Sequence, residues 1–314
     1  MVDVTIIGGG PRARDCGEVL SRSGFSLAHS FEVDTGSHSP IVLGEVQGAF
    51  QLAREAMETG RHLLIAGTQV LTPERLTLLL ERRRQSQALF VWSDRRHHPG
   101  YRFVAGLMES DNMWRPRYLR QEVLCTDHPS SVLFRWRTLE AIAVLTSITG
   151  TEPKTVNATA IVNAKRNAPD LASLSITYKD VEAQLLVGLG EAVERRETLM
   201  ASASRKAYVD ELNSSMPIRI IDDEPVNANS ARWLSCSSPS AEELARQQCI
   251  AFLDATIHAS RTVDEAEIWN SSLAALASME QSLARPGPAD VVIRQEDSKF
   301  RVVAGFHASP PSVA

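Results

Sequence analysis

Short apolar runs alternate with segments of helical periodicity over the first ninety or so residues. The apolar runs are rich in β-branched and aromatic residues, as buried strands are, while the segments between them carry apolar residues three and four positions apart. This alternation is typical of a parallel sheet covered by helices. The expected strands are 2–7, 25–33, 41–46, 62–66 and 88–92, and the expected helices are 15–23, 49–59 and 72–85.

The pattern changes after about residue 117, where the strands become longer and two-sided. They predict a large, mainly antiparallel sheet crossed by a helix at 133–148, with amphipathic helices at 240–258 and 265–284. We therefore expect a shortened Rossmann-type domain at 1–95, an α+β domain at 96–290 and a tail at 291–314. The expected strands of the second domain are 117–125, 155–163, 171–179, 182–189, 197–203 and 206–212.

Composition narrows the class of protein. A chain of 314 residues with 43 % hydrophobic content can bury two cores, and its net charge of −5 comes from interspersed acidic and basic residues, which argues against a nucleic-acid partner. No basic leader and no apolar run of about 18 residues occurs, so we expect a cytoplasmic protein without a membrane partner. The cysteines are widely spaced, which predicts free thiols and no metal site: Cys16, Cys125, Cys236 and Cys249.

A glycine-rich turn follows the first strand and has the pattern G-x-G-x-x-A. In a Rossmann fold the first glycine makes the bend, the second lets the backbone approach a pyrophosphate, and the small last residue lets the helix pack on the strand. A carboxylate near the end of the second strand, either Glu32 or Asp34, could bind ribose hydroxyls, although a solvated strand end is equally compatible with the pattern. The candidate cofactor-binding residues are Gly8, Gly10, Pro11, Arg12, Ala13 and Glu32.

Three further regions of the chain, two of them made of two segments each, resemble a known family. Residues 56–65 with 71–74, residues 94–102, and residues 249–256 with 265–282 resemble, in order and spacing, the Gfo/Idh/MocA family of glucose-fructose oxidoreductase and inositol dehydrogenase relatives. The resemblance spans residues 2–284. It implies NAD(P) in the first domain, a catalytic lysine and histidine for proton transfer, and a homodimer formed through the second domain's sheet.

The chain departs from that family at the residues that carry the chemistry. The lysine position falls within Ala66-Gly67-Thr68, while Arg137 stands where the family has histidine and Glu140 where it has aspartate. The segment before residue 41 also lacks a helix and a strand that the family has. A guanidinium stays protonated near neutral pH and cannot act as an ordinary general base. These departures weigh against bound NAD(P) and against the family's redox mechanism.

Other chemistry remains open to the polar residues of the expected cleft. Arg137 and Glu140 lie one helical turn apart, so they could anchor a carboxylated substrate and accept its proton, or simply form an intrahelical ion pair. His97, at the crossover between domains, is a candidate general acid or base, or an exposed loop histidine. The candidate substrate-binding residues are Arg96, Thr68 and Gln69.

Three functions are compatible with this sequence. The first is an enzyme of the oxidoreductase fold that acts on a small polar or cyclic metabolite by elimination, isomerisation or cyclisation. The second is an NAD(P)-dependent reductase of an imine or activated alkene, and the third is a non-catalytic partner subunit or binding protein. The alternating Leu185, Val187 and Leu189 could form the expected homodimer interface or pack against the chain's own helices.

Overall fold

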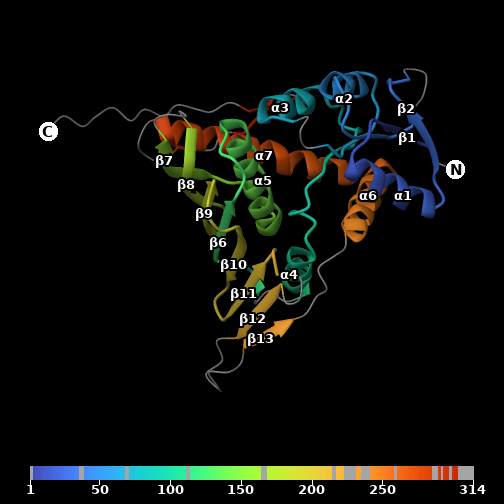
Figure 1. Ribbon diagram of the computed structural model, residues 1–314. Helices are drawn as coiled ribbons and strands as arrows, with labels where there is room; N and C mark the ends of the chain where they lie inside the picture. The colour runs from blue at the N-terminus through green and yellow to red at the C-terminus, as the bar shows by residue number, and fades with distance from the viewer. Residues whose placement is uncertain are drawn as a thin grey trace.

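The computed structural model describes residues 3–34, 39–67, 71–110, 114–163, 168–213, 217–222, 231–234, 241–257, 260–284, 289–290, 293–296 and 299–302. The chain forms two large sheets. The long helix α7 (Ser260–Ala284) extends from one sheet to the other (Figure 1). A two-stranded ribbon of β15 (Ile293–Glu296) and β16 (Lys299–Val302) follows.

The first sheet is parallel throughout, with the strand order β2-β1-β3-β4-β5. The three-residue runs of β3, β4 and β5 are buried at every position, as expected when helices cover both faces of a parallel sheet. This confirms the expected Rossmann-type sheet. A full Rossmann sheet has two strands beyond β1 on this side, whereas the described sheet has one, β2, so the domain is shortened here. Its strands are β1 (Asp3–Ile7), β2 (Ser26–Ser30), β3 (Ile41–Leu43), β4 (Leu63–Ile65) and β5 (Leu89–Val91). Its helices are α1 (Pro11–Arg22), α2 (Ala49–Glu58) and α3 (Pro73–Arg82).

The second sheet has the order β13-β12-β11-β10-β6-β9-β8-β7-β14 within the described residues. Every neighbouring pair is antiparallel except β6 with β9, which confirms the expected mainly antiparallel sheet. The strands are β6 (Tyr118–Cys125), β7 (Thr155–Asn163), β8 (Ala168–Thr177), β9 (Glu182–Leu189), β10 (Arg195–Ala201), β11 (Arg205–Asp210), β12 (Ile218–Asp222), β13 (Ala231–Leu234) and β14 (Ala289–Asp290). Sequence patterning did not predict β12 and β13.

Helix α5 (Ser131–Thr149) and α7 pack together over the second sheet. Leu185, Val187 and Leu189 are 1 %, 0 % and 2 % exposed within the single chain, in one cluster with the apolar residues of α5. They pack against the chain's own helices, so they do not supply a dimer surface. The homodimer itself remains a prediction.

Helix α6 (Ala241–Ile257) returns to the first sheet. It packs against α1, and its Phe252 ring meets Phe90 of β5 edge-on at 5.7 Å between centroids. Cys16 of α1 and Cys249 of α6 are buried free thiols in this cluster. The division at residues 95 and 96 remains a prediction, but a segment from beyond it completes the core of the Rossmann-type domain.

Helix α4 (Pro99–Ser110) lies in a segment that the sequence pattern left as a crossover loop. Its glycines and its charged flank obscure the helical periodicity. Tertiary contacts stabilise it instead, because Tyr101 and Val104 are buried and the Tyr101 hydroxyl lies 2.6 Å from the Thr198 hydroxyl. No described helix is long and apolar enough to cross a membrane.

Candidate functional site

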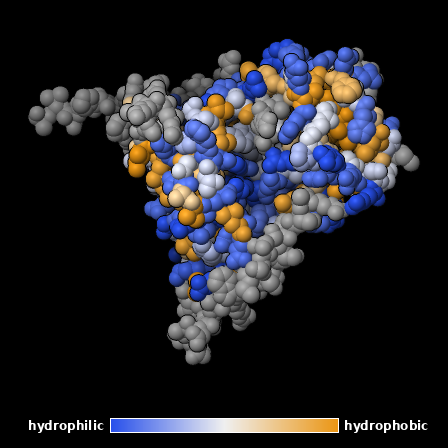
Figure 2. Space-filling model, viewed as in Figure 1, coloured by the Kyte–Doolittle hydropathy of each residue, from blue (hydrophilic) through white to orange (hydrophobic). Residues whose placement is uncertain are grey.

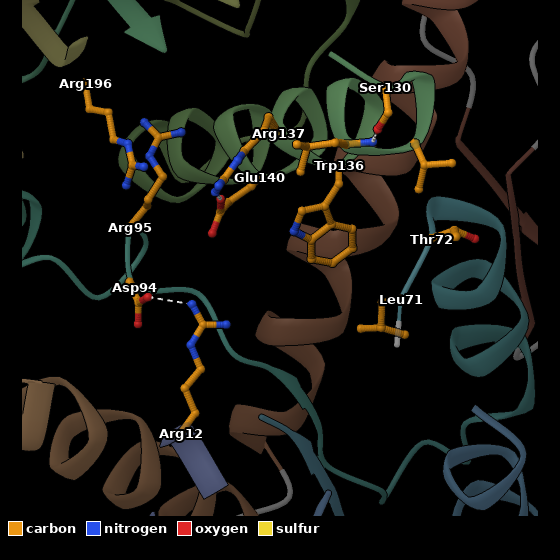
Figure 3. Close-up of a pocket in the computed structure, with 12 residues that line it drawn as sticks. Arg12, Leu71, Thr72, Asp94, Arg95, Ser130, Trp136, Arg137, Glu140 and Arg196 are labelled. Atoms are coloured by element: carbon orange, nitrogen blue, oxygen red, sulfur yellow. Dashed lines mark hydrogen bonds and ion pairs between the residues drawn. The ribbon is translucent and has the colours of Figure 1, made fainter. Parts of the chain in front are cut away.

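A pocket of about 290 Å³ lies between the two sheets. Its walls come from α5, from the segment that follows β5, from the first turn of α1, from the residues that precede α3 and from the start of β10 (Figure 3). Hydrophilic residues gather on the molecular surface between the two lobes (Figure 2). The pocket therefore occupies the place between the domains where the sequence led us to expect a site.

Helix α5 supplies the longest wall of this pocket. Ser130 caps its N-terminus by accepting a hydrogen bond from the Leu133 N–H at 3.1 Å, and Gly150 ends it in the left-handed conformation. The Trp136 ring stacks on Trp269 of α7 with centroids 6.1 Å apart, which fixes the rotation of the helix. Trp136, Arg137 and Glu140 consequently line the pocket.

Three arginines converge on one end of the pocket: Arg95 from the crossover, Arg137 from α5 and Arg196 from β10 (Figure 3). Each has a carboxylate neighbour, Glu211, Asp127 and Glu194 respectively. Each also keeps a buried nitrogen without a hydrogen-bond partner, which is Nη1 in Arg95 and Nε in the other two. An unsatisfied buried donor costs about 1–3 kcal/mol. The three guanidinium groups are the groups at this end of the pocket that could bind an anion.

Glu140 lies beside this arginine cluster. Its Oε1 accepts a hydrogen bond from the Ser93 hydroxyl at 2.8 Å, and its Oε2 lies 3.7 Å from Nη1 of Arg137. The structure thus brings Arg137 and Glu140 together, both as neighbours on the helix and as parts of the pocket wall. Ser93 orients the carboxylate and leaves Oε2 facing the guanidinium.

Arg96 lies elsewhere. Its guanidinium forms a buried ion pair with Glu265, with Nη2 2.9 Å from Oε2, and lies over the Trp269 ring at 5.4 Å. It anchors α7 to the crossover and is not among the described residues that line the pocket. The other two expected substrate-binding residues, Thr68 and Gln69, lie outside the described residues.

His97 is partly buried next to that ion pair, and it is also absent from the described lining of the pocket. Burial, reinforced by the charge of Arg96, lowers the pKa of His97 to about 4. The imidazole is therefore neutral near pH 7 and a weak base there.

The lowered pKa of His97 predicts a dependence of stability on pH. The unfolded chain binds a proton on this histidine near pH 6.5, whereas the folded chain does so only near pH 4, so stability falls as the pH drops between these values. Replacing His97 with asparagine should remove about 1–2 kcal/mol of the loss between pH 7 and pH 5, measured by urea unfolding. The exposed His29→Asn variant is the matched control and should keep the wild-type loss. Equal losses in all three proteins would contradict the assignment.

The glycine turn has the expected backbone geometry. Gly8 and Gly10 adopt φ values of +83° and +94°, which residues with a Cβ rarely take, and Ala13 is buried against the sheet. Arg12 pairs with Asp94 of the crossover at 2.8 Å and faces the pocket. Glu32 is exposed beyond the end of β2.

The residues around this turn do not fit a bound dinucleotide. Pro11 stands at the first position of α1, where it provides no N–H to a phosphate. Glu45, which follows β3, lies against Gly10, the glycine that a pyrophosphate would approach. Among the described residues no group of three histidine, cysteine, aspartate or glutamate side chains is placed to hold a metal ion.

Sequence reasoning missed three charged residues of the pocket, Asp94, Arg95 and Arg196. Arg95 stands in a charged run from which only Arg96 and His97 were selected, and Arg196 stands on a strand without any local signal. Asp94 was named only as part of the family resemblance. The positions of these side chains depend on the pairing of β10 with β6 and on the path of the crossover.

Solved structures share this architecture over nearly the whole chain. UDP-N-acetylglucosamine 3-dehydrogenase GnnA from Acidithiobacillus ferrooxidans is 21 % identical with a TM-score of 0.68, over 90 % of this chain and 97 % of that one. A levoglucosan dehydrogenase in complex with NADH is 12 % identical with a TM-score of 0.69, over 93 % and 99 %. A putative myo-inositol dehydrogenase from Sinorhizobium meliloti 1021 is 14 % identical with a TM-score of 0.66, over 93 % and 100 %.

The chain shares the fold of these dehydrogenases. At these identities the likeness establishes the fold, as the sequence resemblance predicted. No family model and no curated protein sequence matches the chain. A shared fold does not fix the chemistry, which depends on the residues of the pocket.

Proposed function

We propose that this protein is an enzyme of the oxidoreductase fold that acts on a small carboxylated metabolite by acid–base chemistry, such as elimination, isomerisation or cyclisation. The observation that carries the proposal is the convergence of Arg95, Arg137 and Arg196, each with a buried unpaired nitrogen, on one pocket. A pocket of about 290 Å³ suits a small metabolite. Arginine binds a carboxylate through paired N–H donors, which supports an organic acid as the ligand.

The roles of the residues follow from their positions. The arginines bind and orient the substrate carboxylate, and Glu140 Oε2 accepts a proton from the adjacent carbon. Removing that proton spreads negative charge onto the carboxylate, which the fixed guanidinium groups stabilise where the charge develops. The Ser93 hydroxyl, 2.8 Å from Glu140 Oε1, holds the base in place. Trp136 provides an apolar wall for the rest of the molecule.

Two alternatives have some support. Hydride transfer to an imine or activated alkene is favoured by structural neighbours that hold NADH, but Pro11 and Glu45 do not suit the dinucleotide. A non-catalytic binding protein predicts a closed or apolar cleft, whereas this pocket is open and lined by charge. We also propose a cytoplasmic homodimer, without a nucleic-acid or membrane partner.

The test uses small carboxylates as probes. Malonate and succinate should raise the thermal unfolding temperature of the wild-type protein, and inorganic phosphate should do so less, because its tetrahedral shape fits paired guanidinium donors differently. The Arg137→Gln variant should bind either probe about tenfold to a hundredfold more weakly, as expected for the loss of a charged hydrogen bond.

The control is Arg117→Gln, which removes an exposed arginine that is not part of the described pocket lining. It should bind the probes as the wild type does. If malonate and succinate at millimolar concentration stabilise neither the wild type nor Arg117→Gln, the arginine cluster does not bind a free carboxylate.

A further inference from the structure

The strand order of the first sheet locates its ligand crevice. In an open parallel sheet with the order 2-1-3-4-5, ligands bind beyond the carboxyl ends of the strands, where the order reverses between β1 and β3. Two loops flank this place in the chain: Gly8–Gly10 after β1, and Gly44 with Glu45 after β3.

These two loops are joined to each other. The Gly9 N–H donates to the Glu45 carbonyl at 3.0 Å, and the Glu45 N–H donates to the Gly9 carbonyl at 2.7 Å. Two reciprocal backbone bonds form an isolated antiparallel bridge across the crevice. The backbones can meet here because Gly44 has no side chain, since a Cβ on it would stand 2.2 Å from the Gly9 oxygen.

The Glu45 side chain is exposed to solvent and lies against two glycines beside this crevice, Gly10 and Gly67. A Cβ built on Gly10 would stand 2.9 Å from Cδ and 3.2 Å from Oε2 of Glu45, and one on Gly67 would stand 3.4 Å from its Cγ. The carboxylate thus lies on the bare surface of Gly10, which in a dinucleotide fold receives the pyrophosphate. Gly10 is also the N-cap of α1 and offers no side chain to cap it, so the positive end of the helix favours a nearby anion.

We propose that Glu45 is a built-in anion that takes the place of the dinucleotide pyrophosphate. The bridge between Gly9 and Glu45 fixes the backbone from which this carboxylate projects. Pro11 removes one of the N–H donors that a phosphate would otherwise find. The Rossmann-type domain therefore keeps its strand-to-helix corner without binding NAD(P). This inference is independent of the carboxylate pocket and goes beyond the proposed function.

The experiment compares the wild-type protein with Glu45→Ala and Glu45→Gln. The probes are NADH, followed by nicotinamide fluorescence, and inorganic pyrophosphate, followed by thermal unfolding, both up to about 1 mM. We expect no saturable change in the wild type. Glu45→Ala should bind pyrophosphate at least about tenfold more tightly than the wild type does, because it frees the surface of Gly10 and removes the like charge. Glu45→Gln, which removes only the charge, should gain less.

Two controls make the outcomes decisive. Glu18→Ala removes an exposed carboxylate from α1 and should bind like the wild type, which separates a local effect from a change in net charge. Circular dichroism of each variant establishes whether it is folded. If Glu45→Ala does not fold, Glu45→Gln takes its place in the pyrophosphate titration. Saturable NADH binding by the wild type below about 100 µM would overturn the proposal. Unchanged pyrophosphate binding in both folded Glu45 variants would overturn the role of the carboxylate.

Discussion

Replacing Gly44 with alanine is expected to lower the free energy of unfolding by about 3 kcal/mol. The new Cβ would stand 2.2 Å from the Gly9 oxygen and 2.6 Å from the Ala13 Cβ. The first contact is with backbone and the second is with a buried helix residue, so no flexible side chain can move aside. The strand-to-helix corner must shift, and the two hydrogen bonds between Gly9 and Glu45 must lengthen or break. Urea unfolding followed by circular dichroism measures the loss.

Gly106→Ala is the matched control for this substitution. Gly106 lies inside α4, and a Cβ built on it would meet no atom within 4 Å. Alanine there should raise stability by about 0.5–1 kcal/mol, because it favours the helix and restricts the unfolded chain. A Gly44→Ala protein within about 1 kcal/mol of the wild type would show that the loops after β1 and β3 are not in close contact in solution.

Removing the Glu211 carboxylate should have a comparable or larger effect. Glu211 and Arg95 are 4 % and 3 % exposed, their Oε1 and Nη2 atoms are 2.7 Å apart, and the Tyr101 hydroxyl donates to the same carboxylate at 2.6 Å. Glu211→Ala leaves a buried guanidinium without its counter-charge and removes one of the hydrogen-bond partners of the buried Tyr101 hydroxyl. Breaking a buried pair on one side costs about 3–5 kcal/mol. Chemical unfolding at pH 7 measures this loss.

The same carboxylate adds a dependence on acid. Burial alone would raise the pKa of Glu211, but the charge and hydrogen bonds of Arg95 outweigh burial and hold that pKa below its ordinary value of 4.5. Its contribution to stability is therefore complete above about pH 4.5 and is lost as the pH falls through the folded value. The Glu211→Ala protein should lose less stability than the wild type does over that acid range.

Glu58→Ala is the control for this pair. Glu58 is half exposed and pairs with Arg54 and Arg82 on the surface, so its loss should change stability by less than about 0.5 kcal/mol. If Glu211→Ala were equally mild, water would have to reach the Arg95 guanidinium in the folded protein. Arg95 also lines the pocket. A large fall in the free energy of unfolding of Glu211→Ala would therefore show that the ion pair that positions Arg95 in the pocket also stabilises the fold.

Much of the architecture follows from local patterns. The bounds of β7 and β9 coincide with the predicted runs, and Thr72 and Pro73 mark the start of α3 as a capping residue followed by proline should. Helix α4 was missed because contacts with the second sheet, rather than periodicity, stabilise it. The site was only partly predictable: Arg137 and Glu140 lie on one helix face by their spacing, whereas Arg96 and His97 lie outside the pocket lining because α7 binds the crossover.

The sequence by itself determined most of the strands and helices and the glycine turn, because periodicity and turn chemistry are properties of neighbouring residues. Only the tertiary structure decided which charges meet. Arg95 and Arg196 join Arg137 because the crossover and the start of β10 lie beside the same pocket as α5. Glu45 lies against Gly10 because β3 pairs with β1. Such contacts between distant segments depend on packing and strand register, which no local pattern encodes.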